Sequence, residues 1–126
     1  MAKNETVDIE GLTAVLLQKY SEYTDDKCEK AAEITKQTGK EMVKAIKDDS
    51  PVKTGVYRDG WAAEIEQGKG FTKIIGKNKK KPQLTHILQN GHAKTNGGRV
   101  PGVDHIRKNE KKYNELLLER VEEVLK

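Results

Sequence analysis

The proline at position 51 limits how this chain can fold more than any other single residue. Before it, the stretch 25–48 repeats small and apolar side chains three and four positions apart, which is the spacing of one helix face. Pro51 cannot donate a backbone hydrogen bond and disfavours helical geometry at Ser50, so this helix must end there. Beyond the turn, residues 57–66 alternate apolar and polar side chains, as a strand does. A helical first part followed by β structure predicts an α+β fold.

The region 8–49 is predicted to be helical, in two helices. The first covers residues 8–23 and has Asp8 in position to cap it. The second begins after a Thr24 cap and runs to Ser50. Its stripe of small side chains suits close packing against another helix. One continuous bent helix over residues 9–48 remains an alternative.

The rest of the chain predicts a small antiparallel hairpin and two more helices. A turn and hairpin are expected over residues 50–77, with Gly60 as a bulge. A short helix begins at Pro82 and ends at residue 90. The remaining expected segments are a Gly-rich loop over 91–105, an amphipathic helix over 107–125 and a disordered start over 1–7. The length of 126 residues is that of a single domain.

Basic charge is concentrated in the middle of the sequence. Residues 68–112 hold twelve Lys or Arg against two acids, a net +10, whereas residues 1–67 carry −4 and residues 113–126 carry −2. Such a block attracts either DNA phosphates or an acidic protein. Its densest run, Lys79 to Lys81, can equally be the solvated tip of a loop. Only 34% of the residues are hydrophobic, which favours a core shared with partner subunits.

Residues suited to catalysis or metal binding are few. Cys28 is the single cysteine, and it lies among acids on a predicted helix face, which disfavours a thiolate. The two serines occupy no nucleophile elbow, and no phosphate-binding loop occurs. The three histidines have a spacing that matches no common zinc pattern: His86, His92 and His105. Glu64 and Glu66 share one face of the expected strand, as solvating acids more often than as a catalytic pair. The sequence predicts no enzyme, no metal and no cofactor.

Two motifs and the segments after them have a family resemblance. Residues 50–58 read S-P-V-K-T-G-V-Y-R, and residues 84–92 read L-T-H-I-L-Q-N-G-H. They are followed by G-G-R-V-P at residues 97–101 and by D-H-I at residues 104–106. In this order, with a long helix before them, the motifs resemble the tail-component family of long-tailed bacteriophages. The resemblance covers residues 9–125.

The resemblance implies a structural protein of a virion neck or tail. Copies would form a ring that joins the capsid portal complex to the tail, in contact with other neck and tail proteins, after assembly in the host cytoplasm. Non-specific contact with phage DNA is a further possibility. The sequence itself has no apolar run of the length of a membrane span, so no membrane contact is expected. The residues expected to contact partners or direct assembly are Pro51, Thr54, Gly55, Arg58, Lys79, Lys80, Lys81, His92, Arg99 and Pro101.

Three other interpretations stay open. Thr54 and Arg58 can serve only to stabilise the corner between helix and strand. The whole protein can be a small basic nucleic-acid-binding protein without base readout, whose binding would weaken steeply with salt. A small hydrolase or metal enzyme built on the histidines is the third interpretation.

Overall fold

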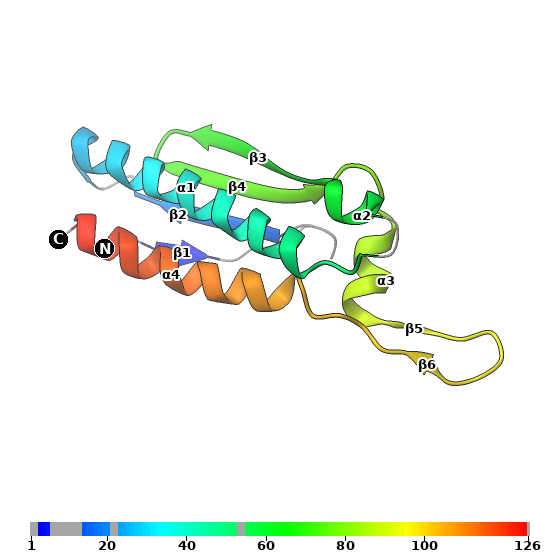
Figure 1. The fold of residues 1–126 in the computed structure, drawn as a ribbon. Coiled ribbons are helices and arrows are strands. Elements are labelled where there is room, and N and C mark those ends of the chain that lie inside the picture. The colour runs from blue at the N-terminus through cyan, green and yellow to red at the C-terminus, as the bar shows by residue number, and fades with distance from the viewer. Residues whose placement is uncertain (1–2, 6–13, 21–22, 53–54, 126) are drawn as a thin grey trace.

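The computed structural model describes residues 3–5, 14–20, 23–52 and 55–125 of the chain. Two long helices, α1 (Asp25–Asp49) and α4 (Arg107–Leu125), lie side by side and antiparallel over one face of a four-stranded sheet (Figure 1). The strands are β1 (Lys3–Glu5), β2 (Ala14–Lys19), β3 (Trp61–Gly68) and β4 (Phe71–Asn78). A short α2 (Val56–Asp59) and α3 (Leu84–Asn90) lie at one end, with a small hairpin of β5 (His92–Ala93) and β6 (Arg99–Val100) beyond them. The predicted α+β class is confirmed.

The sheet is antiparallel, with strand order β1-β2-β4-β3. The register places Leu16 opposite Ile74 and Ile74 opposite Ile65, so these three side chains share the helix-covered face. Val15 and Ile75 pair on the other face, and both are buried. The strands β3 and β4 are joined at Lys69 and Gly70, where the hairpin turn was expected.

The helix α1 begins and ends where the sequence predicted. Thr24 is its N-cap and accepts a hydrogen bond from the backbone N–H of Lys27, and Ser50 is its C-cap. Its predicted stripe faces the core, and at Gly39 the backbone packs directly on Ile74. The small side chains therefore let helix and sheet approach closely.

The helix α4 occupies its predicted range and buries one stripe against α1 and the sheet. On the side facing α1, the Arg120 guanidinium lies 2.6 Å from Glu41 and donates to Thr38 Oγ1 at 3.0 Å. This ion pair and hydrogen bond link the two helices beside their buried stripes. No helix among the described residues is long and apolar enough to cross a membrane.

The predicted helix over residues 8–23, and with it the continuous helix over 9–48, is wrong. Residues 14–19 form strand β2 instead, while residues 8–13 lie outside the described part of the chain. Adjacent residues Val15 and Leu16 are each fully buried, one on each face of the sheet. A strand buried on both faces has an unbroken apolar run, which also fits one face of a helix.

Three smaller predictions also need correction. Tyr57 and Arg58 belong to helix α2, so strand β3 starts only at Trp61, and Gly60 is the helix C-cap rather than a bulge. The loop expected over 91–105 contains the hairpin of β5 and β6, two short strands without apolar alternation. Within the start expected to be disordered, residues 3–5 form strand β1, paired with β2.

Candidate interaction surface

Two hydrogen bonds of the Ser50 side chain stabilise the corner at which the chain leaves α1. Its hydroxyl donates to the carbonyl of Ile46 at 2.6 Å and accepts from the Trp61 indole at 2.9 Å. Ser50 and Trp61 are both buried. The start of the sheet is thereby tied to the end of the long helix.

Arg58 stabilises the same corner from its outer side. Its Nε donates to the carbonyl of Lys47 at 3.2 Å, and its guanidinium lies 3.7 Å from the Asp48 carboxylate. Gly55 has a φ of 85°, a left-handed conformation that favours glycine at the start of α2. The pattern T-G-x-x-R therefore has a structural use at Gly55 and Arg58, while Thr54 lies outside the described residues.

A buried tyrosine–histidine pair joins this corner to the start of α4. Tyr57 Oη lies 2.7 Å from His105 Nε2, and Trp61 packs edge-on against both rings. His105 Nδ1 lies 2.7 Å from the carbonyl of Val103, which can only accept, so Nδ1 carries the proton. His105 Nε2 is then the acceptor and the Tyr57 hydroxyl the donor.

The electrostatics of this pair suit a structural role. Burial lowers the pKa of His105 and raises the pKa of Tyr57, so both side chains are neutral at pH 7. A hydrogen bond from Asn109 is the largest influence that lowers the pKa of Asp49, which also lies 3.4 Å from Lys108. The Asp49 carboxylate is thus paired with both Asn109 and Lys108 at the start of α4.

Gln89 links α3 to the start of α4, where the tyrosine–histidine pair lies. Its Oε1 accepts from the backbone N–H groups of His105 at 3.1 Å and Ile106 at 2.7 Å, and its Nε2 donates to Asp104 at 2.9 Å. The hydrogen bond from Gln89 is also the main reason that the pKa of Asp104 is lowered. Through these contacts the short helix is held firmly on the body of the molecule.

An apolar groove of about 300 Å³ opens between the corner and α3. It is lined by Pro51, Gly55, Val56, Tyr57, Lys81, Leu84 and Leu88. Beside it, Val52 is 58% exposed and Val56 is 39% exposed. An apolar groove with exposed valines at its rim and a lysine in its wall is a surface that can bind another protein.

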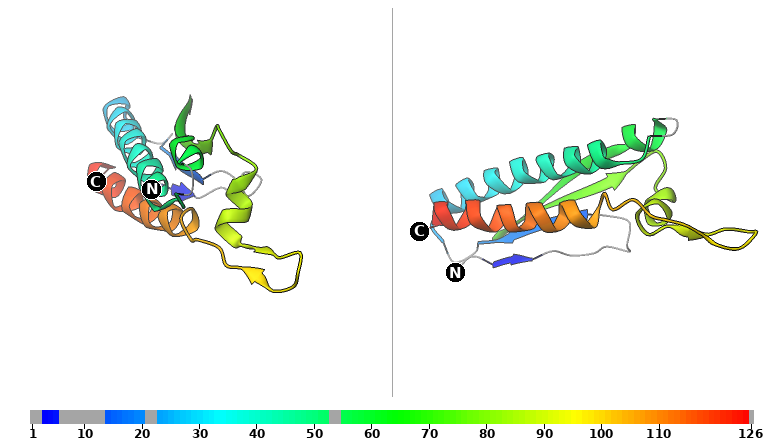
Figure 2. Two further views of the ribbon diagram at one scale, coloured as in Figure 1. Left: turned by 45° about the vertical axis from the view of Figure 1, so that its right-hand side comes forward. Right: turned by 60° about the horizontal axis from the view of Figure 1, so that its bottom comes forward.

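The hairpin of β5 and β6 projects from the body at the end where α2 and α3 lie (Figures 1 and 2), and residues of these two helices line the groove. We call residues 91–103 the arm. Residues 92–99 are all exposed, and Gly97 and Gly98 have positive φ at its tip. Arg99 donates to the carbonyl of Asn90 at 2.6 Å, which fastens the base of the arm to α3.

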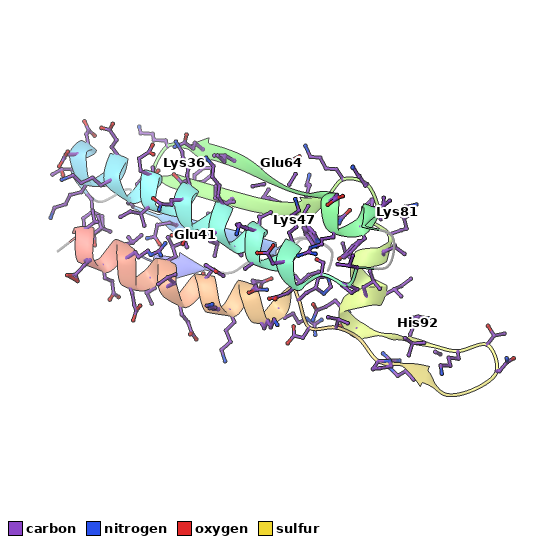
Figure 3. All side chains as sticks on the ribbon, in the orientation of Figure 1. Lys36, Glu41, Lys47, Glu64, Lys81 and His92 are labelled. Carbon is purple, nitrogen blue, oxygen red and sulfur yellow. The ribbon has the colours of Figure 1, made fainter. Side chains whose placement is uncertain are left out.

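The predicted site residues fall into two groups near this end. Pro51, Gly55 and Lys81 line the groove. His92, Arg99 and Pro101 belong to the exposed arm, and Figure 3 shows Lys81 and His92 at the same end of the molecule. The two groups do not form a single compact site.

The lysines of the basic run differ in their surroundings. Lys79 lies 3.7 Å from Glu64, whose pKa is lowered chiefly by a hydrogen bond from Lys77. Lys80 and Lys81 are exposed. Glu64 is thus an ion-paired carboxylate, and Glu66 stands opposite Lys73 in the sheet register.

The histidines are not brought together among the described side chains. His105 is buried at the junction and His92 is exposed on the arm, while the side chain of His86 lies outside the described part. Within that part, no group of three His, Cys, Asp or Glu side chains is arranged to hold a metal ion.

Sequence reasoning missed the residues that build this end of the molecule. The pairing of Tyr57 with His105 and the three hydrogen bonds of Gln89 join positions far apart in the chain, and no local pattern predicts them. The available signal was the position of Gln89 in the motif of residues 84–92 and of His105 in the D-H-I segment of residues 104–106.

Comparison with known proteins identifies the family. Among curated proteins and among solved structures, none matches the chain significantly. The family described as "Bacteriophage HK97-gp10, putative tail-component" matches residues 14–94, more than half of the chain. The matched region runs from β2 through the groove into the base of the arm. The chain therefore belongs to the HK97-gp10-like family of bacteriophage tail components.

Proposed function

We propose that this protein is a non-enzymatic neck or tail-completion component of a tailed phage or prophage, whose copies form a ring that joins the capsid portal complex to the tail. As a tail component it is part of the virion. The host cytoplasm is the place where it would assemble.

The observation that carries this proposal is how the motif residues are used at one end of the molecule. Hydrogen bonds of Ser50, Tyr57 and Gln89 join the elements around an apolar groove and at the base of a projecting arm. A rigid base beneath exposed binding features is what an assembly protein needs. The low hydrophobic content of the chain also favours assembly, because a ring buries additional surface between neighbouring copies.

The role in joining is tested by removing the gene from the phage or prophage that carries it. We expect full capsids and separate tails in electron micrographs, with joined particles restored by the wild-type protein supplied from a plasmid. Joined, infectious particles without the protein would refute the neck role.

The groove is tested by Val56→Glu in the same complementation assay. Val56 is 39% exposed, so a charge there should leave the fold intact while disrupting an apolar contact. Ile65→Glu is the matched control, because Ile65 is 45% exposed on the edge strand β3 and lies outside the lining of the groove. Equal complementation by both variants would exclude the groove as a contact.

Binding to DNA is a second candidate function, favoured by one observation. Residues 79–103 contain five Lys or Arg and no Asp or Glu. A gel-shift titration of duplex DNA at several salt concentrations tests it, with Lys80→Glu/Lys81→Glu as the variant. Binding that falls steeply with salt and weakens in the variant would support DNA contact. Protein that never shifts the DNA, even at low salt, would remove this candidate.

A further inference from the structure

The two ends of the molecule carry opposite charge. At the end of the molecule that carries the arm, residues 79–103 have a net charge of +5. At the other end, the start of α1 and the end of α4 lie next to each other (Figure 1). Residues 25–33 and 115–125 together hold eight acids against three basic side chains, a net −5. The fold thus gathers on one end two acidic segments that are far apart in sequence.

The acidic end has a shallow, open groove of its own, of about 440 Å³. Its lining combines apolar Ile34 and Val124 with charged Asp26, Glu29, Lys30 and Glu33. Lys30 pairs with Asp26 at 3.2 Å, and Glu33 pairs with Lys36 at 3.5 Å. Glu29 is exposed at the rim. We call this the acidic groove.

The arm has matching chemistry. Lys94 and Arg99 supply its positive charge, and Val103 at its base is 43% exposed. An isolated two-stranded hairpin is at best marginally stable in water, and residues 92–99 bury no side chain against the body. A partner that offers carboxylates around an apolar floor would stabilise the arm.

We propose that the arm of one copy docks into the acidic groove of a second copy. The contact is heterologous, because the arm lies at the opposite end of the fold from the start of α1 (Figures 1 and 2), whose residues line the acidic groove. A heterologous contact of this kind builds a ring when the rotation between neighbouring copies closes, and an open filament when it does not. This inference rests on the ring proposed above and names the contact between its neighbouring copies.

Disulfide trapping between two different variants tests the contact directly. Both carry Cys28→Ser, which removes the native thiol and keeps a donor for the carbonyls of Tyr20 and Tyr23. One also carries Thr95→Cys at the tip of the arm, and the other carries Glu29→Cys at the acidic groove. Under mild oxidation of the mixture we expect heterodimers in clear excess over both homodimers. Lys40→Cys, on an exposed middle part of α1, replaces Glu29→Cys as the control.

Charge reversal then tests the chemistry of the contact. Lys94→Glu in the Thr95→Cys protein should lower the heterodimer yield by about tenfold, and Glu33→Lys in the partner should restore part of it. Lys40→Glu in the Thr95→Cys protein is the matched control and should leave the yield unchanged. The yield should also fall as salt is raised.

Two results would overturn the inference: a heterodimer yield no higher than with the Lys40→Cys control, or a yield that is indifferent to Lys94→Glu. Neither result bears on the joining of heads and tails, because the gene deletion tests that role separately. Conversely, a specific heterodimer together with normal particles in the deletion would keep the contact and refute the neck role.

Discussion

Single buried side chains hold the interaction end of the molecule together. The Tyr57 hydroxyl donates to His105 across 48 positions of sequence, and both rings pack against Trp61. The sequence motif predicts a turn at Pro51 and Gly55 from local chemistry alone. It does not predict the partner of Tyr57, because a hydrogen bond between distant positions leaves no periodic signal.

Removing the Tyr57 hydroxyl should destabilise the protein without changing its shape. Tyr57→Phe keeps the ring but leaves His105 Nε2 buried without its donor, so we expect the free energy of unfolding to fall by about 1–3 kcal/mol. Urea denaturation measures this. Tyr23→Phe, which removes the hydroxyl of a half-buried tyrosine near the start of α1, is the control and should change little. Equal effects of the two variants would contradict a special role for the pair.

The same histidine should make stability depend on pH. Burial lowers the pKa of His105 below its ordinary 6.5, so between that lowered value and 6.5 the unfolded chain binds more protons than the folded one. Stability is therefore full above pH 6.5 and falls as the pH drops below it. The slope from one histidine is at most about 1.4 kcal/mol per pH unit.

Thermal unfolding between pH 7.5 and 5 tests this expectation. His105→Gln should be less stable at pH 7.5 but should lose less stability over that range than the wild type. Asp49 and Asp104 have pKa values lowered from 3.8, so their protonation affects stability only at more acidic pH. Parallel pH curves for wild type and variant would show that another group titrates.

At the scale of elements, a helix or strand is predicted correctly from the sequence when it buries one face and exposes the other. The helices α1 and α4 each bury one stripe and expose the rest, so their 3.6-residue period is visible and both were predicted correctly. Strand β2 is buried on both faces at Val15 and Leu16, so its period of two disappears and a helix was predicted. The arm strands have no buried face, which leaves no period of any kind.

The contact between α1 and β4 yields a test of this packing. Gly39→Ala should normally stabilise a helix by about 1 kcal/mol. Here a Cβ at position 39 would overlap the Ile74 side chain, and overpacking costs about 1–3 kcal/mol. We expect a net loss of stability in urea denaturation. Gln37→Ala, at an exposed position of the same helix, is the control, and a Gly39→Ala protein as stable as this control would contradict the close approach.

At the scale of the whole molecule, a body of two helices packed on a sheet carries an exposed arm at one end. Composition along the chain shows an acidic start, a basic middle and an acidic end, and this much is visible in the sequence. The fold converts that order into two oppositely charged ends, because α4 runs back along α1 and brings its acids to the start of that helix (Figure 1). That antiparallel return depends on topology, so sequence charge counts alone could not place the acidic groove.

Removing the arm should therefore leave the body folded but abolish assembly. His92 and Val100 are register partners, so residues 93–99 can be replaced by Asn-Gly as a two-residue hairpin turn. The replaced residues are exposed, and we expect the free energy of unfolding to stay within about 0.5 kcal/mol of the wild type. Circular dichroism and urea denaturation check the fold.

Loss of self-association and of complementation in the deletion strain then measures the function of the arm, with Asn96→Ala in an intact arm as the control. Full complementation by the shortened protein would show that assembly uses the apolar groove without the arm, whereas a large loss of stability would show that the arm belongs to the folded body.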